Sequence, residues 1–353
     1  MLNFSIASKF VIPSLVLFSL TGCNPPTTTP EDTSNQGSTE ISENLPSVVV
    51  TTDVLCDLTQ QIAQNTIALN CLVDAGVDPH VYQATPDDRR SMDQAQLILY
   101  GGYGFEPNLI NLIQATDNPA PKIAVYEQAV NNPIMTDDGH SHGNEDHDHG
   151  HSHHDHNHED DHNQDNSEKF PDPHVWHDVQ NGIKIINVIS QQLAALQPDQ
   201  AEQYQNQANL IKEELNAMDD WIKNQIATIP EDKRILVSNH DALGYFVEAY
   251  GLNSNTALQG VSTEEAPTAG RVGQLVREIQ GSNVPTIFVE SSVNPTLINT
   301  VATEANVQVA NQPLFADGLG EQGSGASTYQ TKIMLNTQTI VEGLGGTFNP
   351  FQL

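Results

Sequence analysis

The sequence predicts an α/β protein of two lobes, each a mainly parallel sheet flanked by helices, joined by one long helix. Short apolar segments alternate with helical segments, first across residues 45–125 and again after residue 229, and this alternation is typical of parallel sheets. Between the two series, residues 198–226 contain few helix breakers. At ~1.5 Å per residue they would form a helix of roughly 40 Å, long enough to run from one lobe to the other.

The first series begins with the β-branched, apolar segment Leu45–Thr52, which we expect to be a buried strand. Strands and helices should then alternate. We expect a helix at Asp57–Ala63, a strand at Ile67–Val73, a helix running into a strand at Ser91–Ile98, a helix at Phe105–Ala115, a strand at Lys122–Val125 and a helix at Asp178–Leu196.

The second series follows the long helix and repeats the same alternation. We expect strands at Arg234–Ser238, Thr286–Val289 and Val307–Ala310. We expect helices at Leu243–Tyr250, Ala269–Gln280, Thr296–Ala305 and Tyr329–Gly343. In domain terms, residues 46–197 form the N-terminal lobe, 198–228 the connecting helix and 229–353 the C-terminal lobe.

The N-terminus is predicted to be an export signal covering residues 1–23. Its apolar run Phe10–Leu20 is too short to span a bilayer, and it ends in Leu-Thr-Gly-Cys, which resembles a bacterial lipobox with Cys23 as the lipidated residue. The alternative is an ordinary signal peptide with an incidental cysteine. Residues 24–45 are polar and predict a flexible tether. We therefore expect a protein in the periplasm or on the cell surface, anchored to the membrane by its N-terminal lipid.

Residues 137–167 consist almost only of His, Asp, Glu, Asn, Gly and Ser, so they cannot join a core and should be a disordered insertion in the N-terminal lobe. Histidine-rich segments bind metal ions weakly, so we expect secondary metal sites there, although an inert solvated loop is the alternative. The histidines concerned are His140, His142, His147, His149, His151, His153, His154, His156, His158 and His162.

The chain has 45 acidic and 13 basic residues, a net charge of −32. This charge argues against nucleic acid and anionic membrane surfaces as partners, so membrane contact should come only through the lipid. We expect a monomer. Besides Cys23 the chain has two cysteines, Cys56 and Cys71. In an oxidising export compartment they can form a disulfide, although two buried thiols fit equally.

Three histidines outside the insertion lie where secondary-structure elements meet loops. His80 follows the second strand, His174 precedes a helix and His240 directly follows the strand RILVS. Ligands of open α/β sheets bind beyond the carboxyl ends of the strands, so these imidazoles could meet on one ion. Imidazole nitrogen suits Zn²⁺, but a single loop histidine is more often an ordinary surface residue.

Family resemblance strengthens this hypothesis. The segments that carry it are GVDPHVYQATPDD (76–88), DPHVWHD (172–178), VSNHDALGYFVEAYGL (237–252), GVSTEEAPTAGRV (260–272) with IFVESSVNP (287–295), and ADGLGEQGSGASTY (316–329). Together they resemble the cluster A-I proteins (solute-binding family 9), which deliver zinc or manganese to ABC permeases. The resemblance implies four metal ligands, His80, His174, His240 and Asp317, and as partners a membrane permease and its ATPase subunit.

The metal is indicated by the third ligand. In the family this position tends to be Glu in manganese binders and His in zinc binders, so His240 implies high-affinity binding of Zn²⁺ as the transported ligand, with a manganese-binding homologue as the alternative. Asp317 could instead form a turn, leaving water as the fourth ligand. His177, where the family usually has an apolar residue, should support the site rather than ligate.

An enzyme is the competing function, because three histidines around zinc with an open position form a hydrolase site. Glu264, Glu265 or Glu290 could supply the acid or base, but nothing in the sequence brings them to the metal, and no HExxH, GxSxG or nucleotide loop occurs. An adhesin is a further alternative that the lipid anchor would permit. We expect a transport protein and no enzyme.

Overall fold

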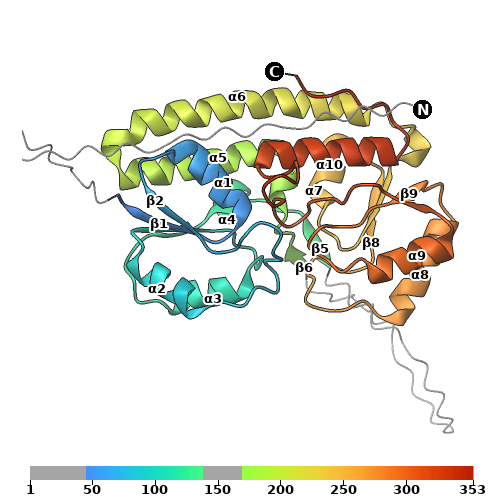
Figure 1. The fold of residues 1–353 in the computed structure, drawn as a ribbon, viewed down its shortest axis with the longest axis horizontal. Coiled ribbons are helices and arrows are strands. Elements are labelled where there is room, and N and C mark those ends of the chain that lie inside the picture. The colour runs from blue at the N-terminus through green and yellow to red at the C-terminus, as the bar shows by residue number, and fades with distance from the viewer. Residues whose placement is uncertain (1–44, 138–168, 353) are drawn as a thin grey trace, which may run out of the picture. The chain divides into compact units, whose positions relative to one another are not determined.

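The computed structural model describes residues 45–137 and 169–352 (Figure 1). The predicted export signal, Cys23, the tether up to residue 44 and the ten histidines of the insertion lie outside the described residues. The described residues cluster into one compact unit, which contains both predicted lobes.

The first lobe is built on a parallel sheet of four strands. These are β1 (Ser47–Val50), β2 (Ala68–Cys71), β3 (Leu97–Tyr100) and β4 (Lys122–Ala124), in the order β2-β1-β3-β4. Successive side chains of a strand point to opposite faces. Accordingly Val48 and Val50 of β1 join the core cluster shared with the long helices, whereas Val49 packs into a second cluster on the other face.

Helices cover both faces of this sheet, as Figure 1 shows. They are α1 (Asp53–Ala63), α2 (Pro86–Gln94), α3 (Pro107–Ala115), α4 (Val125–Ala129) and α5 (Val179–Leu196). The start of α2 has a clear local cause: Thr85 and Asp88 form a capping box, with Pro86 at the first helical position. α1 begins before the predicted Asp57, because Asp53 places its carboxylate in the first turn, where the helix dipole favours a negative charge.

The long helix is α6 (Ala201–Ile226), preceded by a short 3₁₀ turn at Pro198–Gln200. Its buried apolar residues recur every three or four positions and include Tyr204, Ala208, Ile211, Leu215, Met218, Ile222 and Ile226. This stripe packs against α5 and α1 in the first lobe and α10 in the second. α6 therefore runs along both lobes in Figure 1, as the sequence predicts.

The second lobe repeats the α/β pattern. Its strands are β7 (Ile235–Ser238), β8 (Ser254–Ala257), β9 (Thr286–Ile287) and β10 (Gln308–Val309), and its helices are α7 (Gly244–Tyr250), α8 (Ala269–Gln280), α9 (Thr296–Ala305) and α10 (Tyr329–Gly343). β7 pairs with β8 and β9 with β10, both in parallel, and the Phe288 amide donates to the Val237 carbonyl between the pairs. The predicted fold class, two α/β lobes with parallel sheets, is confirmed.

Among the described strands and α-helices, four were not predicted: α4, β8 and a short antiparallel pair, β5 (Met135–Asp137) with β6 (Lys169–Pro171). The pair stands on either side of the histidine-rich segment. Asp137, the first residue of the predicted insertion 137–167, pairs with Lys169 and so belongs to β5. Elements of three to five residues carry too little periodicity to be recognised in a sequence.

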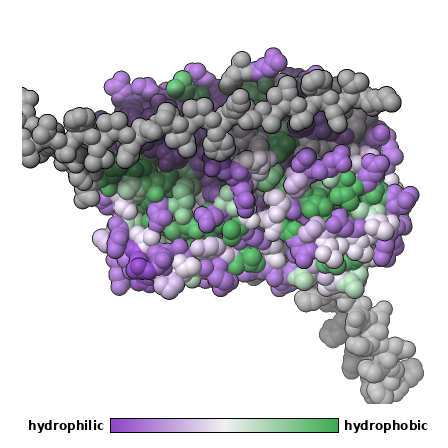
Figure 2. Space-filling model, in the orientation of Figure 1, coloured by the Kyte–Doolittle hydropathy of each residue, from purple (hydrophilic) through white to green (hydrophobic). Residues whose placement is uncertain are grey.

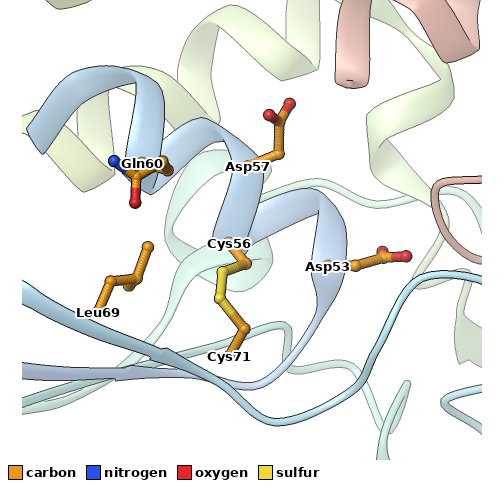
Figure 3. Close-up of a pocket in the computed structure, with 6 residues that line it drawn as sticks. All are labelled: Asp53, Cys56, Asp57, Gln60, Leu69 and Cys71. Carbon is orange, nitrogen blue, oxygen red and sulfur yellow. A yellow bond between two sulfur atoms is a disulfide. The ribbon is translucent and has the colours of Figure 1, made fainter. Parts of the chain in front are cut away.

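Cys56 on α1 and Cys71 at the end of β2 form a disulfide, with 5.8 Å between their Cα atoms (Figure 3). A pocket of about 310 Å³ lies beside it, lined by Asp53, Cys56, Asp57, Gln60, Leu69 and Cys71. The disulfide ties the first helix to the sheet edge. The pocket contains no histidine and is separate from the site described below.

Hydrophilic side chains make up much of the described surface visible in Figure 2, with hydrophobic residues in smaller patches between them. Among helices of residues 45–137 and 169–352, none combines the length and apolar character that crossing a bilayer demands.

Candidate metal centre

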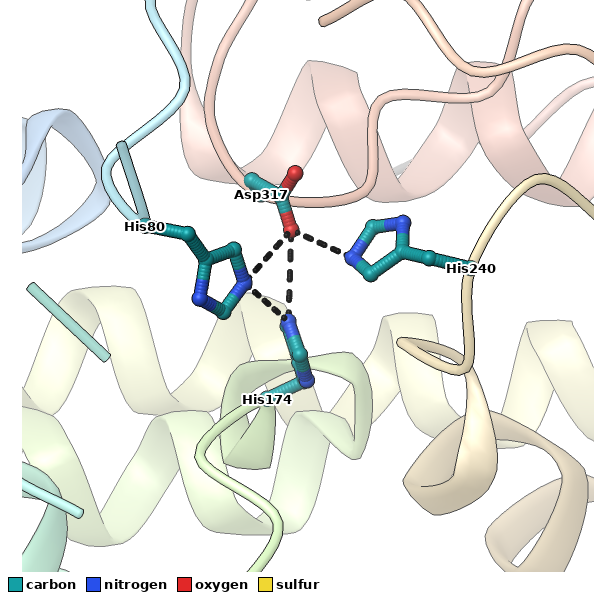
Figure 4. A group of neighbouring side chains, drawn as sticks. All are labelled: His80, His174, His240 and Asp317. Carbon is teal, nitrogen blue, oxygen red and sulfur yellow. Dashed lines mark hydrogen bonds and ion pairs between the residues drawn. The ribbon is translucent and has the colours of Figure 1, made fainter. Parts of the chain in front are cut away.

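Four side chains from four separate segments converge on one point (Figure 4). His80 lies between β2 and α2, His174 just before the 3₁₀ turn Val175–His177, His240 just after β7, and Asp317 between β10 and α10. One possible ligand atom from each lies within 4.8 Å of the others, and all four residues are buried. In the described part of the chain this is the group of His, Cys, Asp or Glu residues that could hold a metal ion.

The Nε2 atoms of the three imidazoles all face the Asp317 carboxylate. Its Oδ1 lies 3.0 Å from His240 Nε2, 3.2 Å from His174 Nε2 and 3.7 Å from His80 Nε2. The Nε2 atoms of His80 and His174 are 3.3 Å apart. The other oxygen of Asp317 accepts the Ser292 hydroxyl at 3.1 Å. Asp317 therefore points into the cluster, and the alternative of a turn closed on its own backbone is not what the structure has.

Two of the imidazoles contact a carboxylate through Nδ1, the ring nitrogen that faces away from the cluster. Asp172 Oδ1 lies 2.8 Å from His174 Nδ1 and also accepts the His174 amide at 2.9 Å. Glu290 accepts the His240 amide at 3.0 Å through one oxygen and hydrogen-bonds His240 Nδ1 through the other. A carboxylate that accepts the Nδ1 proton fixes the ring orientation and leaves Nε2 unprotonated and free to bind a metal ion. This is the usual arrangement of metal-bound histidine.

His80 is held in another way. Among the described residues no carboxylate contacts its Nδ1; its ring meets the edge of Phe105, with centroids 4.9 Å apart, and its amide donates to Asp78 Oδ1 at 2.9 Å. His80 is thus positioned through its backbone and through an aromatic contact rather than through its second ring nitrogen.

The segment bearing Asp317 is anchored mainly by groups of the first lobe. The Leu319 amide donates to the buried Asp53 carboxylate at 2.7 Å. On the other side, the Ala316 carbonyl accepts the Trp176 indole at 3.2 Å and the Lys332 ammonium at 2.8 Å. Lys332, on α10, is fully buried. These bonds fix the backbone on both sides of Asp317, so its carboxylate has little freedom to leave the cluster.

His177 does not join the four residues. It is buried and its Nε2 donates to the Ala316 carbonyl at 3.0 Å, beside Asp317. Its Nδ1 has no hydrogen-bond partner, and burial lowers its pKa well below the ordinary value, so it is neutral. The expected supporting role, rather than ligation, agrees with this geometry.

Burial and mutual charge shift the four titratable groups. Burial lowers the pKa of His80, and its hydrogen bond to Asp317 only partly offsets this. Burial also acts on His174, but the bonds to Asp172 and Asp317 outweigh it and raise its pKa. The charges of Asp317 and Glu290 raise the pKa of His240 well above the ordinary value despite burial. The Asp317 pKa is well below its usual range, because His240 and the other imidazoles outweigh the effect of burial.

Sequence reasoning missed the groups that orient the ligands. Asp172 could have been found, since it lies two residues before His174 in the motif DPH. Glu290 was considered only as an acid or base of an enzyme, and Asp53 not at all, because each meets its partner only through tertiary contacts. The two other carboxylates considered, Glu264 and Glu265, are exposed and lie outside the cluster.

The sequence of this chain is similar to that of known metal-transport proteins. The sequence profile of the family described as zinc-uptake complex component A, periplasmic, matches residues 48–343. The manganese-binding lipoprotein MntA of Halalkalibacterium halodurans is 29% identical over 340 residues, covering 96% of this chain and 98% of the relative. The manganese ABC transporter substrate-binding lipoprotein PsaA of Streptococcus mitis is 31% identical over 297 residues, covering 84% of this chain and 88% of the relative.

Among solved structures, the periplasmic zinc binding protein TroA from Treponema pallidum has a TM-score of 0.73 at 27% identity, covering 85% of this chain and 99% of that chain. The relatives are named lipoproteins and the family is described as periplasmic, which confirms the exported, membrane-anchored localisation predicted from the N-terminus. The chain belongs to the zinc-uptake complex component A family and is the substrate-binding lipoprotein of a metal ABC transporter, not an enzyme.

Proposed function

We propose that this protein captures Zn²⁺ with high affinity between its two lobes and delivers it to the membrane permease of an ABC transporter. One observation carries the proposal: three imidazole nitrogens and one carboxylate oxygen meet at a buried point within 4.8 Å of one another. His80 and His174 come from the first lobe, His240 and Asp317 from the second. A bound ion would therefore be part of the contact between lobes, and a permease could distinguish the loaded from the empty protein.

The donor set favours zinc. Three nitrogens and one oxygen make a four-coordinate site, which is the coordination that Zn²⁺ adopts most often in proteins. Mn²⁺ prefers more oxygen ligands and a higher coordination number. The family tendency at the position of His240, histidine with zinc and glutamate with manganese, points to the same metal.

Manganese is the second candidate, because several relatives are named for it, MntA and PsaA among them. Against this, the family description names zinc, and TroA is titled a zinc binding protein. We give more weight to the donor atoms of this chain than to the names of relatives at about 30% identity.

Asp317 also bears on the hydrolase alternative considered from the sequence. Catalytic zinc keeps one position open for water, whereas in the proposed site the carboxylate of Asp317, close to His174 and His240, would fill the fourth position. Glu290, the carboxylate that could have served as a base, is engaged with His240. The arrangement suits holding an ion rather than activating water.

Transport implies a permease with its ATPase subunit as partners, and the lipid on Cys23 would keep the protein at the membrane where they act. We further propose that the ten histidines between residues 138 and 168, which lie outside the described residues, add weaker zinc sites.

Metal content tests the proposal most directly. The protein is purified without added metal and analysed for bound ions, then stripped with a chelator and titrated with Zn²⁺ and Mn²⁺ in competition with an indicator. Tight binding of one Zn²⁺, well ahead of Mn²⁺, is expected. The variant Glu264→Gln, an exposed carboxylate outside the cluster, serves as a matched control and should bind as the parent does. Preferential retention of Mn²⁺ would overturn the zinc assignment while leaving the transport role in place.

A further inference from the structure

The segment that carries His80 lacks regular structure. It runs between the end of β2 at Cys71 and the start of α2 at Pro86. His80 itself is buried, but the side chains of Val77 and Val81 on either side are 39% and 43% exposed. Segments with few buried contacts open locally at low free-energy cost. His80 is therefore the ligand whose position depends most on a small number of specific bonds.

Asp78 supplies two of these bonds at once. Its Oδ1 accepts the backbone amide of His80 at 2.9 Å, so the carboxylate holds the local turn. Its Oδ2 accepts the hydroxyl of Thr263 at 2.6 Å. Asp78 belongs to the first lobe and Thr263 to the second, 185 positions along the chain. The same carboxylate thus fixes the backbone of a metal-site residue and bridges the two lobes.

Thr263 in turn lies on a segment tied to the backbone around His240. The Gln259 amide donates to the Asn239 carbonyl at 2.9 Å, and the Asp241 amide donates to the Gly260 carbonyl at 3.1 Å. Two hydrogen bonds therefore join the His80 amide to Thr263 through Asp78, and the short backbone segment 259–263 connects Thr263 to the residues on both sides of His240.

We propose that the Asp78–Thr263 hydrogen bond is a latch between the lobes that positions His80 against His240 and sets the rate at which the bound metal leaves. The latch rests on the proposed function, because it acts on metal held by the four-residue site. When the bond is present, His80 is held close to His240 and Asp317, the two site residues of the second lobe. When it is broken, the His80 segment loses this tie and keeps the bond from the Gly76 amide to the Leu319 carbonyl, 3.0 Å long, which lies four residues before His80. His174 and His240 keep their carboxylate partners.

Thr263 is a positioning residue in this account, so its substitution should change the release rate without removing a ligand. Thr263→Val keeps the β-branched shape and removes the hydroxyl, whereas Thr263→Ser keeps the hydroxyl. Thr300→Val is the matched control, since Thr300 is exposed on α9 and its hydroxyl bonds only the Thr296 carbonyl of the same helix. Release is measured by stopped flow after mixing the Zn²⁺-loaded protein with an excess of a chromogenic chelator.

We expect Thr263→Val to release Zn²⁺ about tenfold faster than the parent, the effect of losing one hydrogen bond to a charged acceptor. Thr263→Ser should restore most of the parent rate, and Thr300→Val should match the parent. Asp78→Ala removes both bonds and should release faster still. Adding Thr263→Val to Asp78→Ala should then have little further effect, because the two residues act through one contact.

A second measurement needs no metal. Hydrogen exchange of the amides in residues 76–83 of the metal-free protein should be faster in Thr263→Val than in Thr263→Ser or Thr300→Val. Parent-like release and exchange in Thr263→Val would overturn the latch, as would equal acceleration in the valine and serine variants. If the parent fails to bind Zn²⁺, the proposed function falls, and the exchange comparison still decides whether the bond holds the His80 segment.

Discussion

The three imidazoles of the metal centre are supported in two different ways. His174 and His240 each have a carboxylate on the far ring nitrogen, Asp172 and Glu290, whereas His80 has none among the described residues and is held through its backbone by Asp78. All three imidazoles are buried, but His80 lies in the segment between β2 and α2, where the neighbouring Val77 and Val81 are exposed.

This difference suggests that His174 and His240 contribute most to the affinity for the metal ion, and that His80 controls its release. Carboxylate support makes an imidazole a stronger and better-oriented ligand, so we expect His174 and His240 to be the more firmly held ligands. A ligand on a loosely held segment can leave first, which a protein that must surrender its cargo requires. The predictions below test this division, from the largest expected effect to the smallest.

Removing a ligand should have the largest effect, and should separate the two kinds of histidine. His240→Ala and His80→Ala should each weaken Zn²⁺ binding at the tight site by roughly a thousandfold or more, because three ligands seldom hold the ion as well as four. His240→Ala should also lower the melting temperature of the metal-free protein more than His80→Ala does, because it leaves Glu290 buried without its partner. Competition titration and calorimetry measure the two quantities. Equal melting temperatures would show that the carboxylate support is energetically unimportant.

Removing only the support should have an intermediate effect. Asp172→Asn and Glu290→Gln keep the side-chain shape but remove the charge behind His174 and His240, and each should weaken zinc binding by about 10- to 100-fold. Glu264→Gln, an exposed carboxylate away from the cluster, is the control. Titrations that find all three variants equal to the parent would contradict the distinction drawn here.

Exchanging a nitrogen donor for an oxygen should change selectivity. His240→Glu should move preference toward Mn²⁺, since a hard carboxylate replaces imidazole. The structure adds a condition: the new carboxylate would face Glu290, and two buried like charges repel. His240→Glu combined with Glu290→Gln should therefore bind Mn²⁺ better than His240→Glu alone. Paired Zn²⁺ and Mn²⁺ titrations measure this, and an unchanged preference in both variants would refute it.

Acid should weaken metal binding earlier than ordinary histidines would allow. Metal requires unprotonated imidazole, and the pKa values of His174 and His240 in the metal-free site are raised above the ordinary 6.5 by their carboxylates. These groups keep their protons to a higher pH, so affinity should begin to fall above pH 6.5 as the pH decreases. Glu290→Gln removes a charge that raises the His240 pKa, and should move the onset to lower pH. Titrations from pH 5 to 9 test both statements; the same onset in the two proteins would argue against the role of Glu290.

Breaking the disulfide should affect stability but scarcely affect binding. Cys56 and Cys71 are 15 positions apart, and closing a loop of that length stabilises a folded chain by about 3 kcal/mol. Cys56→Ser with Cys71→Ser should lower the free energy of unfolding by about that amount, measured by urea titration, and leave zinc affinity within a factor of about 2. A large loss of affinity would mean that the start of α1, where Asp53 holds the Leu319 amide, transmits to the metal centre.

Much of the fold could be predicted because its signals are local. Helices with strong periodicity or clear caps, such as Ala269–Gln280 and Tyr329–Gly343, were predicted with the bounds that the structure has. The short strand Ser254–Ala257 and the β5–β6 pair were not, since pairing with a distant segment rather than local pattern creates them.

The sequence by itself determined the two-lobe α/β class and contains the lipobox, because residue type and alternation carry that information. It suggested that three histidines meet, and the resemblance of its motifs to a family added Asp317. Only the tertiary structure decided what supports each of them: Asp172 behind His174, Glu290 behind His240, and Asp78 with Thr263 beside His80. These partners are joined by hydrogen bonds across 50 or more positions in the last two cases. Such contacts depend on distance in space, which residue spacing along the chain does not encode.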